Sequence, residues 1–343
     1  MRSILPFTSI IDQEQLKQAL ILNAINQRIG GVLIRGAKGT GKSTTVRALA
    51  ELLPEVDIVE DCPFRCNPSD PTNMCEVCRD KMQKGELDIS RKRMEVVELP
   101  IGATEDSVVG TLNIEKAIRE GVRALEPGVL AKANQNILYV DEINLLPDHI
   151  TDVILDAAAS GWNIVEREGI SVQHPARFIL VGTMNPEEGE LRPQLLDRLA
   201  LHTEISTIKD PALRVEVVKV NMRYEDDPEA LKDDYRDRQE ELVKRILKAK
   251  ALLPEVSIPD KLYEVVAYMC INLNIDGHRP DIIMIKSART LAAFMDRSTV
   301  EPQDILDCAF LTLSHRTRNL GREPPASERI IREAYNRAMS GVS

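Results

Sequence analysis

The chain has 343 residues, enough for about two domains at roughly 150 residues each. Hydrophobic residues make up 43% and charged residues 29%, which is ordinary for a folded protein and excludes a wholly disordered chain. The 44 Lys and Arg residues are outnumbered by 54 Asp and Glu residues, and aromatic residues are only 3%. This composition argues against a nucleic-acid-binding protein, which needs clustered cations and stacking platforms.

The N-terminal segment MRSILPFTSI has neither the apolar run nor the small-residue cleavage site of a signal peptide. No stretch approaches about 18 consecutive apolar residues, so we expect no membrane-spanning helix and no membrane partner. Together these patterns predict a cytoplasmic protein, in which thiols stay reduced.

Short apolar runs alternate with longer helix-like segments in the first part of the chain. The runs occupy positions 32–35, 96–99, 137–140 and 178–181. Runs of this kind are typical of strands buried on both faces, and the alternation favours an α/β fold with a parallel sheet. After about residue 208 the chain changes to successive amphipathic helices, for example at 241–253 and 262–273.

A glycine-rich segment fits the phosphate-loop pattern G-x-x-x-x-G-K-[ST]. It consists of Gly36, Ala37, Lys38, Gly39, Thr40, Gly41, Lys42 and Ser43. A predicted strand precedes it and a predicted helix follows, which is the context that this motif requires. We expect backbone N–H groups to surround the phosphates, Lys42 to reach the β- and γ-phosphates, and Ser43 to bind Mg²⁺. The segment therefore predicts a nucleoside triphosphate site.

A pair of carboxylates, Asp141 and Glu142, directly follows the apolar run at 137–140. A buried strand would deliver Asp141 to the metal at its carboxyl end, and Glu142 would polarise the attacking water. This pair indicates ATP hydrolysis rather than phosphoryl transfer to a small acceptor.

Two further polar residues have alternative interpretations. Asn185 follows the apolar run at 178–181 and could hold the water or the γ-phosphate, or it could be a turn residue before Pro186. Arg198 could reach a phosphate in a neighbouring subunit or pair with a local carboxylate.

The order of these motifs resembles an AAA+ ATPase. More narrowly, the sequence resembles the family of the ATPase subunit I of magnesium chelatase, and the similarity covers nearly the whole chain. The stretches that carry it are LPIGATEDSVVGTLNIEKAI (99–118), EPGVLAKANQNILYVDEINLL (126–146), GWNIVEREGISVQHPARF (161–178) and NPEEGELRPQLLDR (185–198).

The resemblance implies an AAA+ P-loop domain with a parallel sheet and an inserted β-hairpin, followed by a C-terminal all-helical lid domain. The expected limits are 1–223 for the ATP-binding domain, 224–240 for a linker and 241–343 for the helical domain. Apart from the resemblance, alternating polar and apolar residues in the segment at 161–178 predict a β-hairpin, with two strands joined by a turn at Arg167, Glu168 and Gly169. The alternative is a plain sheet edge.

The family also implies an activity and partners. Its ATPase subunit forms hexameric rings and works with a second AAA+ subunit and a large porphyrin-binding subunit. ATP hydrolysis then drives insertion of Mg²⁺ into protoporphyrin IX, a ligase reaction of chlorophyll and bacteriochlorophyll biosynthesis. By resemblance, Asn185 is the first sensor, Arg198 the arginine finger acting in trans, and Arg279 the second sensor.

A cysteine-rich insert at 60–80 is the main departure from the photosynthetic pattern. Its cysteines are Cys62, Cys66, Cys75 and Cys78. Four thiolates at these spacings could surround Zn²⁺, hold an iron–sulfur cluster, or remain free or redox-active thiols. Cys270 and Cys308 lie in helical patterns and are expected in the core.

Other functions compete with the magnesium chelatase hypothesis. An AAA+ protein remodeller would share the ring and the hairpin, and so would a nucleic-acid translocase, which the acidic charge disfavours. The same motor could also serve a cobalt or nickel chelatase, because the choice of metal would belong to the large partner.

Overall fold

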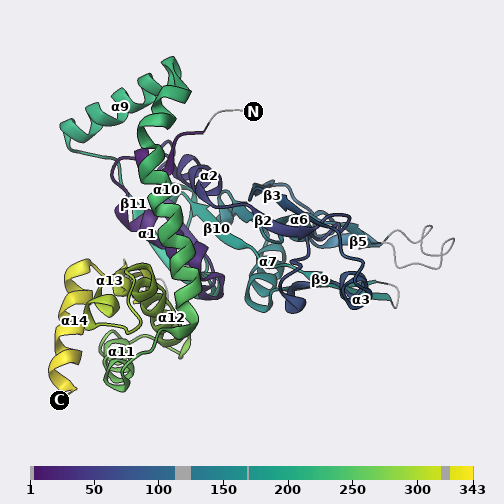
Figure 1. Ribbon diagram of the computed structural model, residues 1–343. Coiled ribbons are helices and arrows are strands. Elements are labelled where there is room, and N and C mark those ends of the chain that lie inside the picture. Colours follow the sequence, from purple (N-terminus) through teal and green to yellow (C-terminus); the bar gives the residue numbers. More distant parts are fainter. Residues whose placement is uncertain (1–3, 113–124, 168–169, 318–324, 343) are drawn as a thin grey trace. The chain divides into compact units, whose positions relative to one another are not determined.

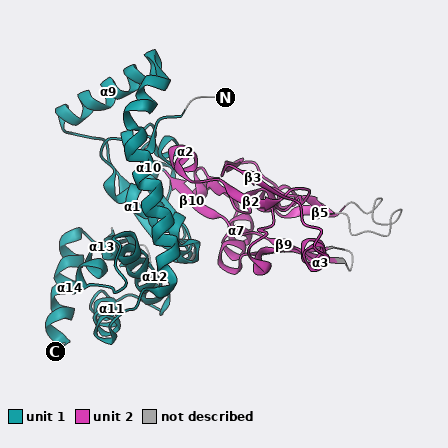
Figure 2. Cartoon of the chain, viewed as in Figure 1, with its two compact units in different colours: residues 1–45, 185–343 teal, residues 46–184 magenta. Residues whose placement is uncertain are grey.

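A computed structural model describes residues 4–112, 125–167, 170–317 and 325–342 (Figure 1). The chain divides into two compact units, one of residues 1–45 and 185–343 and the other of residues 46–184 (Figure 2). Among the described residues, no helix is both long enough and apolar enough to cross a bilayer.

The first unit contains two strands of the main sheet and most of the helices. Its elements are α1 (Glu14–Ile25), β1 (Val32–Gly36), α8 (Pro193–Arg198), β11 (Leu201–Ile205), α9 (Pro211–Asp226), α10 (Pro228–Leu252), α11 (Asp260–Asn272), α12 (Arg279–Phe294), α13 (Pro302–Leu313) and α14 (Glu328–Gly341). The polar stretch 224–240 is helical, since it ends α9 and begins α10. The domain limits expected at 223 and 240 stay a prediction.

The second unit contains the remaining strands. Its elements are β2 (Val56–Val59), α3 (Glu76–Lys84), β3 (Ile89–Lys92), β4 (Val96–Leu99), α4 (Glu105–Val109), β5 (Gly110–Leu112), β6 (Leu125–Pro127), α6 (Val129–Ala133), β7 (Ile137–Val140), α7 (Asp148–Ser160), β8 (Trp162–Arg167), β9 (Ile170–Pro175) and β10 (Ile179–Met184). The helix α2 (Lys42–Leu52) begins in the first unit and continues into the second.

The main sheet has five strands in the order β11-β1-β10-β7-β4. β1 pairs in parallel with β11, and β7 pairs in parallel with both β10 and β4. Every residue of β7 and β10 is buried, as expected of strands in a covered parallel sheet. The predicted α/β fold is therefore confirmed.

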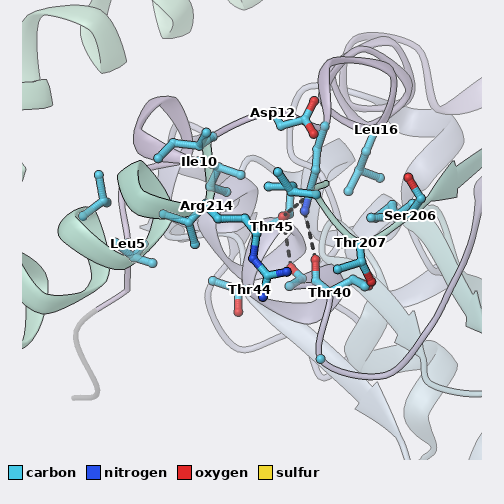
Figure 3. Close-up of a pocket in the computed structure, with 18 of the residues that line it drawn as sticks. Leu5, Ile10, Asp12, Leu16, Thr40, Thr44, Thr45, Ser206, Thr207 and Arg214 are labelled. Atoms are coloured by element: carbon cyan, nitrogen blue, oxygen red, sulfur yellow. Dashed lines mark hydrogen bonds between the residues drawn. The ribbon is translucent and has the colours of Figure 1, made fainter. Parts of the chain in front are cut away.

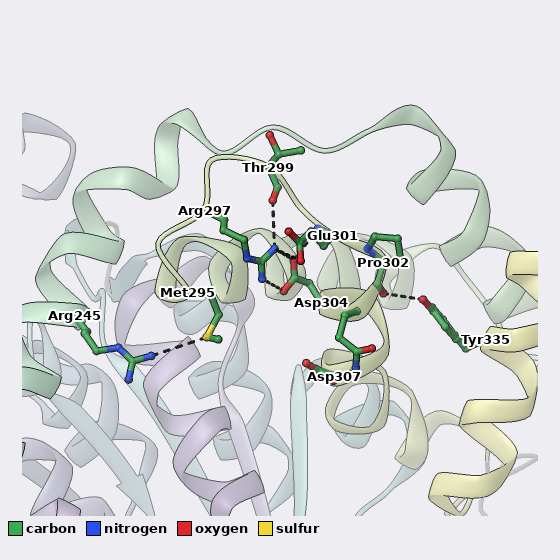
Figure 4. Close-up of polar contacts among 10 residues, drawn as sticks. Arg245, Met295, Arg297, Thr299, Glu301, Pro302, Asp304, Asp307 and Tyr335 are labelled. Atoms are coloured by element: carbon green, nitrogen blue, oxygen red, sulfur yellow. Dashed lines mark hydrogen bonds and ion pairs between the residues drawn. The ribbon is translucent and has the colours of Figure 1, made fainter.

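The C-terminal part of the first unit is helical, as predicted. α12 packs against α13, and α11 packs against α14. A capping box of Glu301 and Asp304 starts α13, and Arg297 donates hydrogen bonds of 2.8 and 2.5 Å to the Asp304 carboxylate (Figure 4). Tyr335 of α14 donates a 3.0 Å hydrogen bond to the Pro302 carbonyl oxygen, which ties the last helix to the start of α13.

The strands β8 and β9 form an antiparallel hairpin, with Trp162 opposite Pro175. They make a two-stranded sheet of their own, so the predicted hairpin is confirmed over the plain sheet edge. The expected turn residues Glu168 and Gly169 lie outside the described residues, as does the end of the family-like stretch from residue 113.

Candidate functional site

The phosphate loop connects β1 to α2, and glycine is required at several of its positions. A Cβ atom at Gly36 would lie 2.6 Å from the carbonyl oxygen of Ile205 on β11, so a larger residue would push the paired strands apart. Gly39 and Gly41 both have φ +81°, a left-handed conformation that side chains rarely adopt. The loop leads directly into the N-terminus of α2, where the backbone N–H groups of the first turn and the helix dipole favour an anion.

The Lys42 side chain is held over the loop. Its Nζ donates hydrogen bonds to the carbonyl oxygens of Gly36 at 2.6 Å and Ala37 at 2.9 Å. Ser43 and Thr44 are exposed in the first turn of α2. A lysine ammonium and an exposed serine hydroxyl are thus presented at the loop, as the motif predicts.

A pocket of about 860 Å³ opens beside the phosphate loop within the first unit (Figure 3). The N-terminal segment, the loop, the end of β11 and α9 line it, and Asp12 and Arg214 supply charges of opposite sign. Gln13 connects these parts. Its Nε2 donates to the Thr40 carbonyl oxygen at 2.9 Å, and its Oε1 accepts from the Thr45 hydroxyl at 3.1 Å. The volume falls in the range of small-molecule sites.

Asp141 and Glu142 follow β7, and a single hydroxyl fixes both of them. Thr183 of β10 donates a 2.6 Å hydrogen bond to the Asp141 carboxylate and accepts the Glu142 backbone N–H at 3.1 Å. Tyr139 also donates to the Asp141 carboxylate, at 3.1 Å. Burial raises the pKa of Tyr139, so its hydroxyl stays protonated and remains a donor.

The backbone of Glu142 is left-handed, with φ 52° and ψ 53°. This conformation costs a residue with a Cβ atom roughly 1–2 kcal/mol. The strain sets the direction in which the glutamate leaves the strand, and the hydrogen bond to Thr183 maintains it.

Asn185 lies just beyond β10, and its side chain is buried. Its Oδ1 accepts the backbone N–H of Glu187 at 3.3 Å. This contact is the turn role that the sequence offered as an alternative, and the sensor role stays a prediction.

Arg198 and Arg279 lie together in the first unit, at the end of α8. Arg279 donates a 3.0 Å hydrogen bond to the backbone carbonyl of Arg198. The buried Arg316 donates to the Asp197 carboxylate at 3.0 Å and to the Leu199 carbonyl at 3.0 Å. Burial lowers the pKa of Arg316 to about 10. The predicted arginine finger, Arg198, thus lies at the end of α8, where Arg279 and Arg316 donate hydrogen bonds to the backbone.

The four cysteines of the insert converge in the second unit. The Sγ atoms of Cys62, Cys66, Cys75 and Cys78 all lie within 4.8 Å of one another. Cys62 is half-buried and the other three are buried. Hydrogen bonding from the neighbouring thiols, above all Cys66, lowers the pKa of Cys62 and favours its thiolate. The spacing read from the sequence therefore produces a cluster that could bind a metal. Cys270 and Cys308 are buried in α11 and α13, as predicted.

Sequence reasoning missed Gln13, Thr183 and Arg316 as residues of the site. Thr183 had one signal, because it follows the buried part of a predicted strand beside the one that delivers Asp141. Gln13 and Arg316 had none, since their contacts join segments far apart in the chain.

Comparison with known proteins identifies the family of this chain. Residues 26–188 match the family described as AAA domain, and residues 266–334 match the family described as AAA lid domain. The magnesium-chelatase subunit ChlI homolog of Methanocaldococcus jannaschii is 56% identical over 95% of this chain and 88% of its own length. The magnesium-chelatase subunit ChlI of Synechocystis is 50% identical over 99% of this chain and 96% of its own length. The chain belongs to the ChlI family.

Two solved structures are similar to this chain. A structure of the complex between subunits BchI and BchD of magnesium chelatase is 43% identical, has a TM-score of 0.56 and covers 97% of this chain and 100% of that chain. A putative ATPase from Cytophaga hutchinsonii is 16% identical with a TM-score of 0.63, over 96% of this chain and 91% of that one, and it shares the fold. The expected AAA+ domain with a helical lid is confirmed, and a ChlI-family AAA ATPase uses ATP and Mg²⁺.

Proposed function

We propose that this chain is the ATPase motor subunit of a magnesium chelatase, coupling ATP hydrolysis to insertion of Mg²⁺ into protoporphyrin IX by a large partner subunit. The observation that carries the proposal is a complete phosphate loop in a ChlI-family chain that also holds Asp141 and Glu142 in a fixed arrangement. A second AAA+ subunit is a partner, since the similar BchI subunit is in complex with BchD.

In this proposal the pocket beside the phosphate loop receives the nucleotide. The N–H groups at the start of α2 and the Lys42 ammonium bind the phosphates. The pocket volume beyond the loop takes the adenosine part, and Gln13 keeps the loop in position by its bonds to Thr40 and Thr45.

The carboxylates perform the hydrolytic step. Ser43 and Asp141 would hold Mg²⁺, and the bound ion would neutralise charge on the phosphates. Glu142 accepts a proton from the attacking water, and Asn185 orients that water or the γ-phosphate.

The arginines complete the site across a homo-oligomeric ring, most simply a hexamer as in the family. Arg198 reaches the γ-phosphate bound to the next subunit and stabilises charge that develops in the transition state. Arg279 acts as the second sensor, and its hydrogen bond to the Arg198 backbone couples the two residues. A zinc ion or an iron–sulfur cluster at the four cysteines is a further component of the proposal.

Two substitutions test hydrolysis. Lys42→Ala should abolish ATP binding, because it removes the cation that faces the phosphates. Glu142→Gln should keep binding and lose turnover by at least about 100-fold, since general-base catalysis contributes that much. ATP affinity and phosphate release are measured for both, with the exposed Lys244→Ala on α10 as the matched control. Wild-type hydrolysis by Glu142→Gln would exclude this residue as the base.

A reconstituted assay tests the chelatase role. The chain is combined with the second AAA+ subunit and the large subunit, and Mg²⁺, Co²⁺ and Ni²⁺ are compared with ATP present. ATP-dependent insertion of Mg²⁺ into protoporphyrin IX supports the proposal. Insertion of cobalt or nickel alone would make this the motor of another chelatase, and no insertion of any metal would favour a protein remodeller.

A further inference from the structure

The four cysteine sulfurs have the spacing of ligands on a single ion. Sulfurs at the corners of a tetrahedron around Zn²⁺, each at about 2.3 Å, are separated by about 3.8 Å. Here the Sγ of Cys62 lies 3.4 Å from that of Cys66 and 3.9 Å from that of Cys75. An iron–sulfur cluster shares its thiolates among several iron atoms and spreads them further apart. The geometry therefore favours one ion over a cluster.

The backbone around the cluster also suits bound thiolates. Cys75 caps the N-terminus of α3, and Cys78 lies in the first turn, where the helix dipole favours negative charge. The Cys75 backbone N–H donates to the Cys66 sulfur at 3.1 Å. Such an N–H···S contact stabilises the thiolate and orients it.

We propose that Cys62, Cys66, Cys75 and Cys78 bind one structural Zn²⁺ ion. We further propose that the cysteine segment, residues 60–80, then acts as a platform for the base of the β8–β9 hairpin, where β8 begins and β9 ends. Binding replaces the thiol protons, which pass to water. The proposal deepens the metal component of the proposed function by choosing zinc and giving it a structural role, and it does not depend on ATP hydrolysis.

The cysteine segment has little regular secondary structure before α3 and a small apolar core. Between β2 and α3 the only regular structure is a three-residue 3₁₀ helix, Pro71–Asn73. The apolar cluster under it is small, and three of its five fully buried members are the cysteines Cys66, Cys75 and Cys78 themselves. A structural zinc ion would supply bonds that so small a core lacks.

Several contacts join the cysteine segment to the hairpin base. The Phe64 ring stacks on His174 of β9, with centroids 4.8 Å apart and the planes parallel. The Arg79 guanidinium of α3 lies over the ring of Trp162, the first residue of β8, at 5.9 Å. Arg177, just after β9, pairs with Asp70 of the segment at 2.6 Å.

The contacted hairpin residues are in turn fixed to the rest of the second unit. His174 is fully buried, and its Nε2 lies 2.9 Å from Asn163 Nδ2. Asn134 accepts the backbone N–H of Arg177 and donates to the Phe64 carbonyl oxygen at 2.7 Å. The cysteine segment therefore contacts the first residue of β8, Trp162, and the residue before the end of β9, His174.

The metal is tested first by analysis of the full-length chain, purified without chelators. We expect about one zinc per chain and no visible absorbance. Cys75→Ser should lower the retained zinc at least about tenfold, since loss of even an outer-shell partner costs that much affinity. Cys270→Ser, at a buried cysteine of α11 outside the cluster, is the matched control and should retain zinc. Iron with acid-labile sulfide, or metal-free protein with four reactive thiols, would overturn the proposal.

The platform is tested with the wild-type protein, so the result does not depend on whether a variant folds. Trp162 is the single tryptophan of the chain and therefore reports on the hairpin base. Removing zinc with a chelator should shift its emission to the red and expose the β8–β9 hairpin to proteases. Adding Zn²⁺ back should reverse both changes. Unchanged emission and cleavage after zinc loss would show that the hairpin does not rest on the metal.

Discussion

A single threonine hydroxyl links the two acidic residues that follow β7. Thr183 donates to the Asp141 carboxylate and accepts from the Glu142 backbone, so it fixes one side chain and the direction of the other. Thr183 acts through these two residues, so we regard it as a positioning residue.

Replacing Thr183 with valine keeps the shape of the side chain and removes both hydrogen bonds. We expect kcat for ATP hydrolysis to fall about 10- to 100-fold, because small displacements of catalytic groups cost that much, while ATP affinity changes little. Thr183→Ser should restore turnover, since it keeps the hydroxyl. Steady-state kinetics and Tm of both variants are measured. Equal loss of turnover in Val and Ser variants would reduce Thr183 to a packing role.

At the residue scale, the sequence predicts the parts of the site that sit in one contiguous motif. The loop Gly36–Ser43 and the pair Asp141 and Glu142 could be predicted because a local pattern specifies their chemistry. Gln13 and Arg316 could not, since a glutamine before a helix and an arginine after one carry no such pattern. Their roles arise from contacts with Thr40 and Asp197, which only the folded chain brings near.

At the element scale, burial decides which strands can be predicted. β4 and β7 match apolar runs, and the run at 178–181 predicts β10 within a few residues. β11 was missed because LHTEI mixes polar and apolar residues, although all of its residues except Glu204 are buried. It occupies an end of the main sheet and pairs only with β1 among the described strands, so its sequence pattern is weaker.

The start of α13 shows how one buried carboxylate supports a helix. Asp304 is 2% exposed, accepts both bonds from Arg297 and accepts the Glu301 backbone N–H at 2.8 Å. Asp304→Ala should destabilise the protein by about 2–4 kcal/mol, because it removes a cap and the buried carboxylate that accepts two hydrogen bonds from Arg297, which keeps only its longer ion pair with Glu301. Denaturant unfolding measures this change. The exposed Asp307→Ala, one turn later, should stay within about 0.5 kcal/mol of the wild type, and an equal loss there would contradict the specific role of Asp304.

At the scale of the whole molecule, the compact units do not follow the chain. The first unit joins residues 1–45 to residues 185–343, through the pairing of β1 with β11 and the packing of α1 against β11 and α10. A sequence shows changes of composition along its length, and so it predicts contiguous domains. Pairing between distant strands leaves no local trace, which is why this division could not be predicted.

The proposed ring predicts complementation between inactive subunits. Arg198→Ala keeps an intact phosphate loop, and Lys42→Ala keeps an intact finger, so some interfaces of a mixed ring combine the working half of each. We expect each variant alone to lose most ATPase activity and the mixture to recover part of it. Activity is measured across mixing ratios, with mixed rings verified by differently tagged subunits. Normal hydrolysis by Arg198→Ala alone would exclude an arginine finger at this position.

The left-handed backbone of Glu142 lowers the stability of the folded state at a residue that is proposed to be needed for ATP hydrolysis. A glycine at this position would adopt φ 52° without the steric penalty that a Cβ atom imposes, so the folded state would lose a strain of roughly 1 kcal/mol. The same change would delete the proposed base. Selection for stability alone would favour the substitution, whereas selection for the proposed role in hydrolysis would retain the glutamate. Stability and the proposed activity therefore make opposite demands on this position. A screen that selects only for a high Tm would tend to yield Glu142→Gly chains that are stable and inactive.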